Sequence, residues 1–290
     1  MKKLRWGALL LSAALLIGPL SVAAVGAPIS RYEKTVSSKE ISRYERIRVT
    51  AGQKSLTGYL IEGTTYVPLR ALAGALTDAS VGYNAATKTA TLNGKGLSLS
   101  VKNGAHILYV NGRCLYLDMP AVILSDGSFY LPVRPLGEAL SASVGWNDQN
   151  RSVTVKKTAS GYKTAADVYD ENDLYWLSRI ISAESRGEPF LGQVAVGNVV
   201  LNRVKSKQYP NSIYGVIFDK KNGIQFTPAV NGSIYKTPTN TSIEAAKVCL
   251  EGYTLSESIL FFFEPSIAES SWISKNRPFA FRLGAHHFYN

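Results

Sequence analysis

Apolar residues at helical spacing mark the second half of the chain. Leu174, Leu177 and Ile181 lie on one face of a helix, and Asp170 just before them suits a helix start. The next position on that face is Glu184, which places a carboxylate in line with residues expected to be buried. The pattern therefore predicts a helix from about residue 170 that ends near an unusually placed acid.

A second apolar run follows Pro189, a residue suited to open a helix. Valines recur through this run at positions 194, 196, 199, 200 and 204, and Gly197 permits close packing. The run predicts a mostly buried helix. Glu188, next to Pro189, is expected to be a helix-start carboxylate. Arg203, near the end of the run, fits either of two roles: capping the helix or orienting a neighbouring carboxylate.

The first half of the chain contains a repeat. Residues 65–72 match residues 129–136, and the similarity continues into residues 82–92 and 145–155. Each copy reads as a strand ending at a proline, a short helix and a hairpin with a polar turn. Arg70 and Arg134 follow the prolines at equivalent corners, where we expect them to hydrogen-bond backbone carbonyls.

The beginning of the chain has the pattern of a secretory signal peptide. Lys2, Lys3 and Arg5 precede an apolar run over residues 9–17, and small residues at 23–27 offer cleavage sites. This run is shorter than the roughly 20 residues of a membrane span, although an uncleaved anchor is the alternative. We expect residues 1–27 to be removed, no stable membrane insertion afterwards, and a secreted protein.

Length and composition favour two folded domains. The chain has 290 residues, 46% of them hydrophobic and 18% charged, which excludes a disordered protein. A polar segment without periodicity follows the repeat and predicts a linker over residues 158–169. We expect a duplicated, β-rich α+β module over residues 35–157. The domain at 170–290 is expected to be α+β, with a helical core and a small sheet.

Charge and metal-ligand content limit the partners. The net charge is +11, and removing residues 1–27 leaves 29 basic against 21 acidic residues, or +8. No basic run or groove-reading motif indicates nucleic-acid binding, so anionic envelope polymers are the expected polyelectrolyte partners. Cys114 and Cys249 lie in separate domains and are predicted to be free thiols. With three histidines in the chain, we expect no metal and no cofactor.

The setting of Glu184 indicates acid catalysis. A carboxylate at an apolar margin is poorly solvated, which raises its pKa and keeps it protonated near neutrality. That protonation state is the one that a general acid needs for a glycosidic oxygen. The alternative is a glutamate that reaches solvent where its helix ends.

Longer segments carry a resemblance to known families. Residues 177–189 (LSRIISAESRGEP), 192–204, 225–234 and 284–289 together resemble the spore cortex-lytic enzyme SleB cell wall hydrolases, over residues 170–290. Ser185 stands where that family commonly has alanine. Residues 35–157, with their repeated Tyr-x-Pro-x-Arg corner, resemble the copper amine oxidase N-terminal-like domain. Despite its name that domain implies no copper, and we interpret it as a wall-associating module.

The SleB resemblance implies a lytic transglycosylase of peptidoglycan with a lysozyme-like fold. Glu184 would be the catalytic residue, protonating the oxygen between N-acetylmuramic acid and N-acetylglucosamine and then deprotonating the muramic C6 hydroxyl. The groove would be lined by Gln225, Phe226, Asn231, Tyr235 and His286. Asn231 with Gly232 also fits a hairpin turn. Tyr253, the residues 261–263 and Trp272 are expected in core and strand.

Two other functions remain open at this stage. A zinc amidase would cut the bond between glycan and peptide, although neighbouring His286 and His287 would face opposite sides of a strand. A non-catalytic wall-binding protein is the second alternative. All three interpretations place the protein in the cell wall or spore envelope of a Gram-positive bacterium, acting on the cortex or the vegetative wall.

Overall fold

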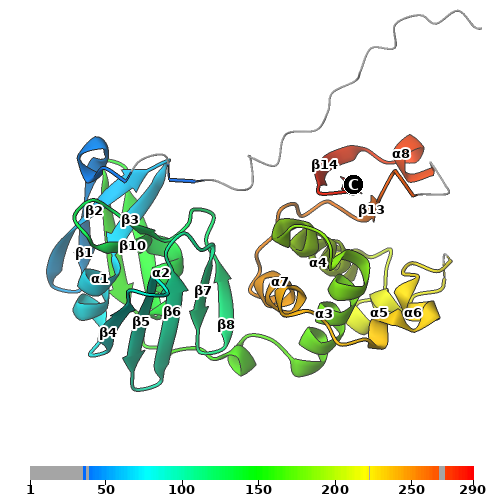
Figure 1. The fold of residues 1–290 in the computed structure, drawn as a ribbon, viewed down its shortest axis with the longest axis horizontal. Helices are drawn as coiled ribbons and strands as arrows, with labels where there is room; N and C mark the ends of the chain where they lie inside the picture. Colours follow the sequence, from blue (N-terminus) through cyan, green and yellow to red (C-terminus); the bar gives the residue numbers. More distant parts are fainter. Residues whose placement is uncertain (1–34, 37–38, 222, 268–271) are drawn as a thin grey trace, which may run out of the picture.

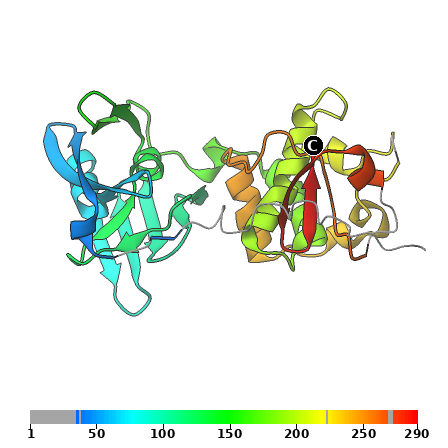
Figure 2. The ribbon, with the colours of Figure 1, turned by 90° about the horizontal axis from the view of Figure 1, so that it is seen from above.

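Two domains lie side by side in the computed structural model, which describes residues 35–36, 39–221, 223–267 and 272–290. The N-terminal domain is built mainly of strands and the C-terminal domain mainly of helices (Figure 1, Figure 2). The sequence predicted this division correctly. The predicted signal peptide, residues 1–27, lies outside the described residues.

The described part of the N-terminal domain contains two sheets. A seven-stranded sheet has the order β11-β12-β1-β2-β3-β10-β9, and a five-stranded sheet runs from β4 to β8 in chain order. Apart from the parallel pair of β1 and β12, neighbouring strands are antiparallel. The strands of the first sheet are β1 (Glu45–Ala51), β2 (Lys54–Ile61), β3 (Thr64–Pro68), β9 (Val122–Ile123), β10 (Phe129–Pro132), β11 (Ala142–Asn147) and β12 (Ser152–Lys157). Those of the second are β4 (Ser80–Asn84), β5 (Thr89–Gly94), β6 (Leu97–Lys102), β7 (Ile107–Val110) and β8 (Arg113–Tyr116).

Both copies of the sequence repeat form the expected strand, helix and hairpin. In the first copy β3 leads into α1 (Leu69–Leu76) and then the β4–β5 hairpin; in the second, β10 leads into α2 (Val133–Ala139) and the β11–β12 hairpin. A 3-10 helix, η2 (Ile41–Arg43), precedes β1. The expectation for Arg70 and Arg134 was wrong. Both side chains are exposed, and among the described residues neither guanidinium forms a hydrogen bond to the corner carbonyls.

The C-terminal domain packs helices against a small sheet with the order β13-β15-β14. Its helices are η3 (Ala165–Asp167), α3 (Glu171–Ser185), α4 (Phe190–Lys205), α5 (Ile213–Ile217), α6 (Pro228–Asn231), η4 (Ser233–Tyr235), α7 (Asn240–Leu250) and α8 (Trp272–Asn276). Its strands are β13 (Phe261–Phe263), β14 (Phe279–Leu283) and β15 (His286–Tyr289). In the part of the chain that the structure describes, no helix has the length and apolar character of a membrane span.

The helical core confirms the predicted periodicity. Asp170 caps α3 by accepting hydrogen bonds from the amides of Asn172 and Asp173, and Leu177 and Ile181 are fully buried. Helix α4 is buried along most of its length and packs against α3 and α7. A Cβ at Gly197 would lie 2.6 Å from the Cys249 sulfur and 2.9 Å from Ile181, so glycine permits this close packing.

The two domains meet along β8 and α7 (Figure 1). Arg113, 3% exposed, donates from Nε and Nη2 to the Glu251 carboxylate, whose side chain is 5% exposed. Tyr116 packs on Tyr253 across the boundary, with ring centroids 4.4 Å apart. Cys114 and Cys249 are free and buried, as predicted, although Cys114 belongs to the apolar cluster of the helical domain.

The predicted linker also makes fixed contacts. Thr164 and Asp167 form a capping box at η3, and the amide of Ala165 donates to the Asn111 carbonyl. The Tyr169 hydroxyl donates to the Gly112 carbonyl at 3.3 Å. The connection between the domains is thus held against the β-rich domain at several points.

We expect Arg113→Ala to be much more destabilising than Arg151→Ala. Removing Arg113 leaves the buried Glu251 without its cation, which costs about 3–5 kcal/mol in comparable sites. Arg151 pairs with Glu45, but their side chains are 55% and 47% exposed, and such pairs contribute at most about 1 kcal/mol. Urea denaturation of both variants measures the difference. Equal stabilities would show that the domains do not depend on the Arg113–Glu251 pair.

Candidate active site

Glu184 lies in the last turn of α3, one residue before the helix ends. Its side chain is half-buried, and it continues the apolar face that Leu177 and Ile181 begin. The neighbouring side chain of Ser185 is buried, and its hydroxyl donates to the Ile181 carbonyl at 2.7 Å. The helix therefore fixes the backbone of Glu184, whose side chain lines a cleft.

The environment of Glu184 favours the protonated acid. Burial raises the pKa of its carboxyl group to about 7, and the positive charge of Arg203 opposes this rise. Loss of hydration therefore outweighs the nearby cation. The carboxyl group is half protonated close to neutral pH, as the sequence analysis expected from its position at an apolar margin.

Glu184 opens into a cleft of about 800 Å³. Gln225, Phe226 and His286, three of the predicted groove residues, line the same cleft. They come from the segment before α6 and from β15, so the fold brings together positions up to about 100 residues apart. An amide, an aromatic ring and an imidazole thus line the same cleft as one acid, a combination suited to binding a polar ring compound.

Two predicted groove residues lie elsewhere. Asn231 ends α6 and accepts a hydrogen bond from the Ser233 amide, and Tyr235 is 61% exposed in η4; neither lines the cleft. The hairpin expected at Asn231 and Gly232 is also wrong. Pro228 opens a short helix there, and Gly232, with φ of 81°, ends it in the left-handed region.

His286 is buried in the wall of the cleft. It is 7% exposed, and its Nδ1 has no hydrogen-bond partner among the described residues. Burial holds the pKa of His286 below its ordinary value, although the charges of Glu188 and Glu264 oppose this. The neutral ring can therefore exchange a hydrogen bond with a ligand. His287, its neighbour on β15, packs beside Phe279 instead.

Arg203, for which the sequence left two roles open, lines the cleft. It is 5% exposed, and its Nε donates to the Leu260 carbonyl at 2.9 Å. Its guanidinium lies 5.1 Å from the ring centroid of Phe226, which favours a cation there. Its Nη1 is buried without a partner in the described ranges. Arg203 is therefore a buried cation with a donor still to be satisfied and a charge that acts on Glu184.

Aromatic residues expected in core and strand form another wall of the cleft. The residues Phe261–Phe263 do form a strand, β13, but they are only partly buried and line the cleft together with Trp272, which is 53% exposed. Sequence patterns could not separate these roles, because both require apolar rings. The cleft also contains a second carboxylate, Glu264, which accepts a hydrogen bond from the Ser266 hydroxyl at 2.6 Å.

Glu188 has a structural position outside the cleft. Its carboxylate accepts a hydrogen bond from the Ala285 amide at 2.9 Å, across the turn between β14 and β15. Gly284 in this turn has φ of 58°, and a side chain there would collide with the Glu188 carboxylate. Within the described residues, His, Cys, Asp and Glu form no group of three that could ligate a metal ion.

Comparison with known proteins identifies both domains. Residues 187–289 match the family model of the cell wall hydrolases. The C-terminal domain belongs to the cell wall hydrolase family. Residues 49–155 and 109–168 match the copper amine oxidase N-terminal domain. The match of the hydrolase domain begins three residues after Glu184, so the role of Glu184 stays a prediction.

Individual relatives agree with this family. The chain is 41% identical over 120 residues to the spore cortex-lytic enzymes of Bacillus cereus and of Bacillus subtilis strain 168, covering 41% of this chain and 45% and 38% of those proteins. It thus spans less than half the length of these relatives. The catalytic domain of the germination-specific lytic transglycosylase SleB from Bacillus anthracis is 40% identical; the match covers 42% of this chain and 97% of that one, with a TM-score of 0.39.

The raised pKa predicts a pH-dependent difference in stability between the wild type and Glu184→Gln. Folded Glu184 binds its proton more tightly than the unfolded chain does, so this contribution is complete below the unfolded pKa and is lost as pH rises through about 7. The variant cannot ionise at this position. We therefore expect it to gain stability relative to the wild type between pH 4.5 and 7, by at most about 3 kcal/mol. Urea denaturation at both limits measures it, and a constant difference would contradict the raised pKa.

Proposed function

We propose that this protein is a lytic transglycosylase that cleaves peptidoglycan between N-acetylmuramic acid and N-acetylglucosamine. The observation that carries the proposal is a half-buried carboxyl group with a pKa of about 7, at a cleft of about 800 Å³. The family of the hydrolase domain supports a cell wall substrate, and a solved relative is a germination-specific lytic transglycosylase. A lysozyme-like arrangement of this domain belongs to the same proposal.

Glu184 acts twice in the proposed reaction. As an acid it gives its proton to the bridging glycosidic oxygen while the bond to the muramic C1 breaks. The resulting carboxylate then accepts the proton of the muramic C6 hydroxyl, whose oxygen attacks C1 and closes a 1,6-anhydro ring. Glu184 gives up one proton in the first step and accepts one in the second, so no other residue has to supply or remove a proton. A pKa near 7 lets both of its protonation states form readily.

The cleft offers contacts that suit this substrate. The Gln225 amide can bind the N-acetyl and hydroxyl groups of a sugar, and the rings of Phe262 and Trp272 can pack on sugar faces. Arg203 Nη1 is a buried donor within the cleft wall. A carbonyl or hydroxyl oxygen of the glycan would satisfy that donor, which helps to hold the reacting ring beside Glu184.

Glu264 favours one alternative, hydrolysis by water. Glycosidases that use water normally need two carboxylates at the scissile bond, and Glu264 is a second carboxylate in this cleft. That reaction leaves reducing ends rather than anhydro rings. The zinc amidase interpretation gains no support from the described residues, because they offer no cluster of metal ligands.

The location follows from the same proposal. The protein is secreted after removal of residues 1–27 and acts in the wall or spore envelope, with residues 35–157 as a wall-associating module and residues 170–290 as the catalytic domain. Its positive charge supports association with anionic wall polymers.

We expect Glu184→Gln to abolish most of the activity. The amide keeps the shape of the acid but cannot donate and recover a proton, so the release of anhydro-muropeptides should fall about 10²–10⁴-fold. Chromatography and mass spectrometry of digested peptidoglycan provide the measurement. Similar release by wild type and variant would refute the mechanism.

Two matched variants act as controls in that experiment. Glu188→Gln retains an oxygen that can accept from the Ala285 amide and should lose little activity. Glu264→Gln should also remain active, since a lytic transglycosylase needs a single carboxylate. Loss of activity in Glu264→Gln, together with reducing ends from the wild type, would instead establish hydrolysis by water.

The charge of Arg203 should control the pH profile. Arg203 lowers the pKa of Glu184, so Arg203→Met should raise it further and move the alkaline limb of the rate profile to higher pH. Arg203→Lys keeps the charge and should keep the limb near its original position, even if the rate falls. Rates of muropeptide release from pH 5 to 9 measure both. An unmoved limb in Arg203→Met would exclude the electrostatic role.

A further inference from the structure

The two repeats of the N-terminal domain are arranged with local two-fold symmetry. Strands β3 and β10 pair antiparallel, with Val67 opposite Leu131. These residues occupy the same position in the two repeats, and Tyr66 opposite Pro132 is mirrored by Tyr130 opposite Pro68. A two-fold rotation about this strand pair therefore places each repeat on the other. A surface that is built from parts of both repeats is then expected to occur twice.

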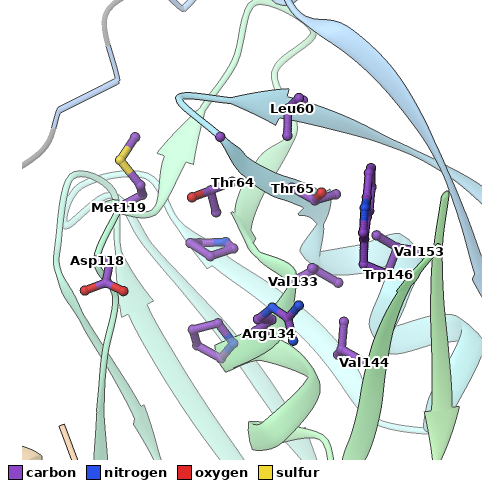
Figure 3. Close-up of a pocket in the computed structure, with 13 residues that line it drawn as sticks. Leu60, Thr64, Thr65, Asp118, Met119, Val133, Arg134, Val144, Trp146 and Val153 are labelled. Carbon is purple, nitrogen blue, oxygen red and sulfur yellow. The ribbon is translucent and has the colours of Figure 1, made fainter. Parts of the chain in front are cut away.

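Two hollows show this duplication. We call them the Tyr83 pocket, of about 980 Å³, and the Trp146 pocket, of about 420 Å³. Each combines the proline–arginine corner and hairpin of one repeat with the strand turn of the other. Arg70, Tyr83 and Ser128 line the first pocket, and their counterparts Arg134, Trp146 and Thr64 line the second (Figure 3).

Each pocket presents the same chemistry. The arginine is exposed and makes no hydrogen bond or ion pair within the described residues. The aromatic side chain is accessible, with Tyr83 49% exposed and Trp146 partly so. Each pocket also contains one carboxylate, Asp126 in the Tyr83 pocket and Asp118 in the Trp146 pocket. Each pocket is therefore lined by an aromatic ring, a guanidinium donor, a carboxylate acceptor and a hydroxyl group.

We propose that these two pockets bind saccharide units of peptidoglycan. This proposal rests on the proposed function for its polymer and extends it to a second part of the chain. Aromatic faces pack on sugar rings, arginine donates to N-acetyl oxygens and hydroxyls, and aspartate accepts from hydroxyls. The aspartate in each pocket offsets the arginine and disfavours a polyanion. A neutral glycan therefore fits better than an anionic wall polymer.

Two equivalent pockets also suit a repeating ligand. Peptidoglycan presents the same disaccharide many times on adjacent strands, so a second unit binds at a raised local concentration once the first is held. Weak single sites then give firm retention on a polymer. Short oligosaccharides that fill one pocket should bind much more weakly than the peptidoglycan polymer.

The test measures co-sedimentation of the full chain carrying Glu184→Gln with insoluble peptidoglycan stripped of teichoic acid. Tyr83→Ala and Trp146→Ala should each weaken binding about 3–10-fold, the usual value of one aromatic contact, and the double variant should lose more than either. Arg70→Gln and Arg134→Gln provide a second pair of variants in case Trp146→Ala fails to fold. Lys95→Gln, in the exposed turn between β5 and β6, removes the same charge outside both pockets and should bind like the parent.

Either of two results would overturn the proposal. One is a folded double variant, or the pair Arg70→Gln and Arg134→Gln together, that still binds like the parent. The other is binding that disappears once teichoic acid is stripped, which would identify an anionic polymer as the ligand. Because binding is measured without cleavage, failure of the proposed cleavage appears separately, as wild-type protein that releases no anhydro-muropeptides.

Discussion

The partial loss of hydration at one carboxyl group, that of Glu184, sets the electrostatics of the cleft in the C-terminal domain. Glu184 stands where the packed face of α3 ends, with Phe226 from a distant loop and aromatic rings of β13 around the cleft. Arg203 at the end of α4 opposes the loss of hydration without cancelling it. Helices α3 and α4 approach closely at Gly197, where a bulkier residue would have to displace Ile181 and Cys249.

Local patterns predicted the parts of the site that depend on a single element. The period of Leu177 and Ile181 and the cap at Asp170 placed α3 correctly, and with it Glu184. The repeat likewise predicted its two strand–helix–hairpin units. These features are set by residues within a few turns of one another, so a sequence contains them directly.

The remaining features depend on residues that meet only after folding. An arginine near a helix end can cap the helix or line a cleft. Arg203 lines the cleft, because its side chain donates to the Leu260 carbonyl and lies over the Phe226 ring. Asn231 with Gly232 is a frequent turn, but Pro228 starts a helix that Gly232 ends. Arg113 and Glu251 are 138 positions apart, and neither sequence neighbourhood indicates the other.

The contacts between the domains limit the directions in which the cleft can reach. The Tyr253 hydroxyl of the hydrolase domain donates to Asp118, a residue of the Trp146 pocket, beside the buried ion pair of Arg113 and Glu251. Because these contacts hold the two domains in few relative orientations, the effective concentration of the cleft is high along one direction. Along other directions it is near zero. Under the proposed function, the cleft would then cut glycan strands that run along that direction and leave intact those that the pockets hold at other angles.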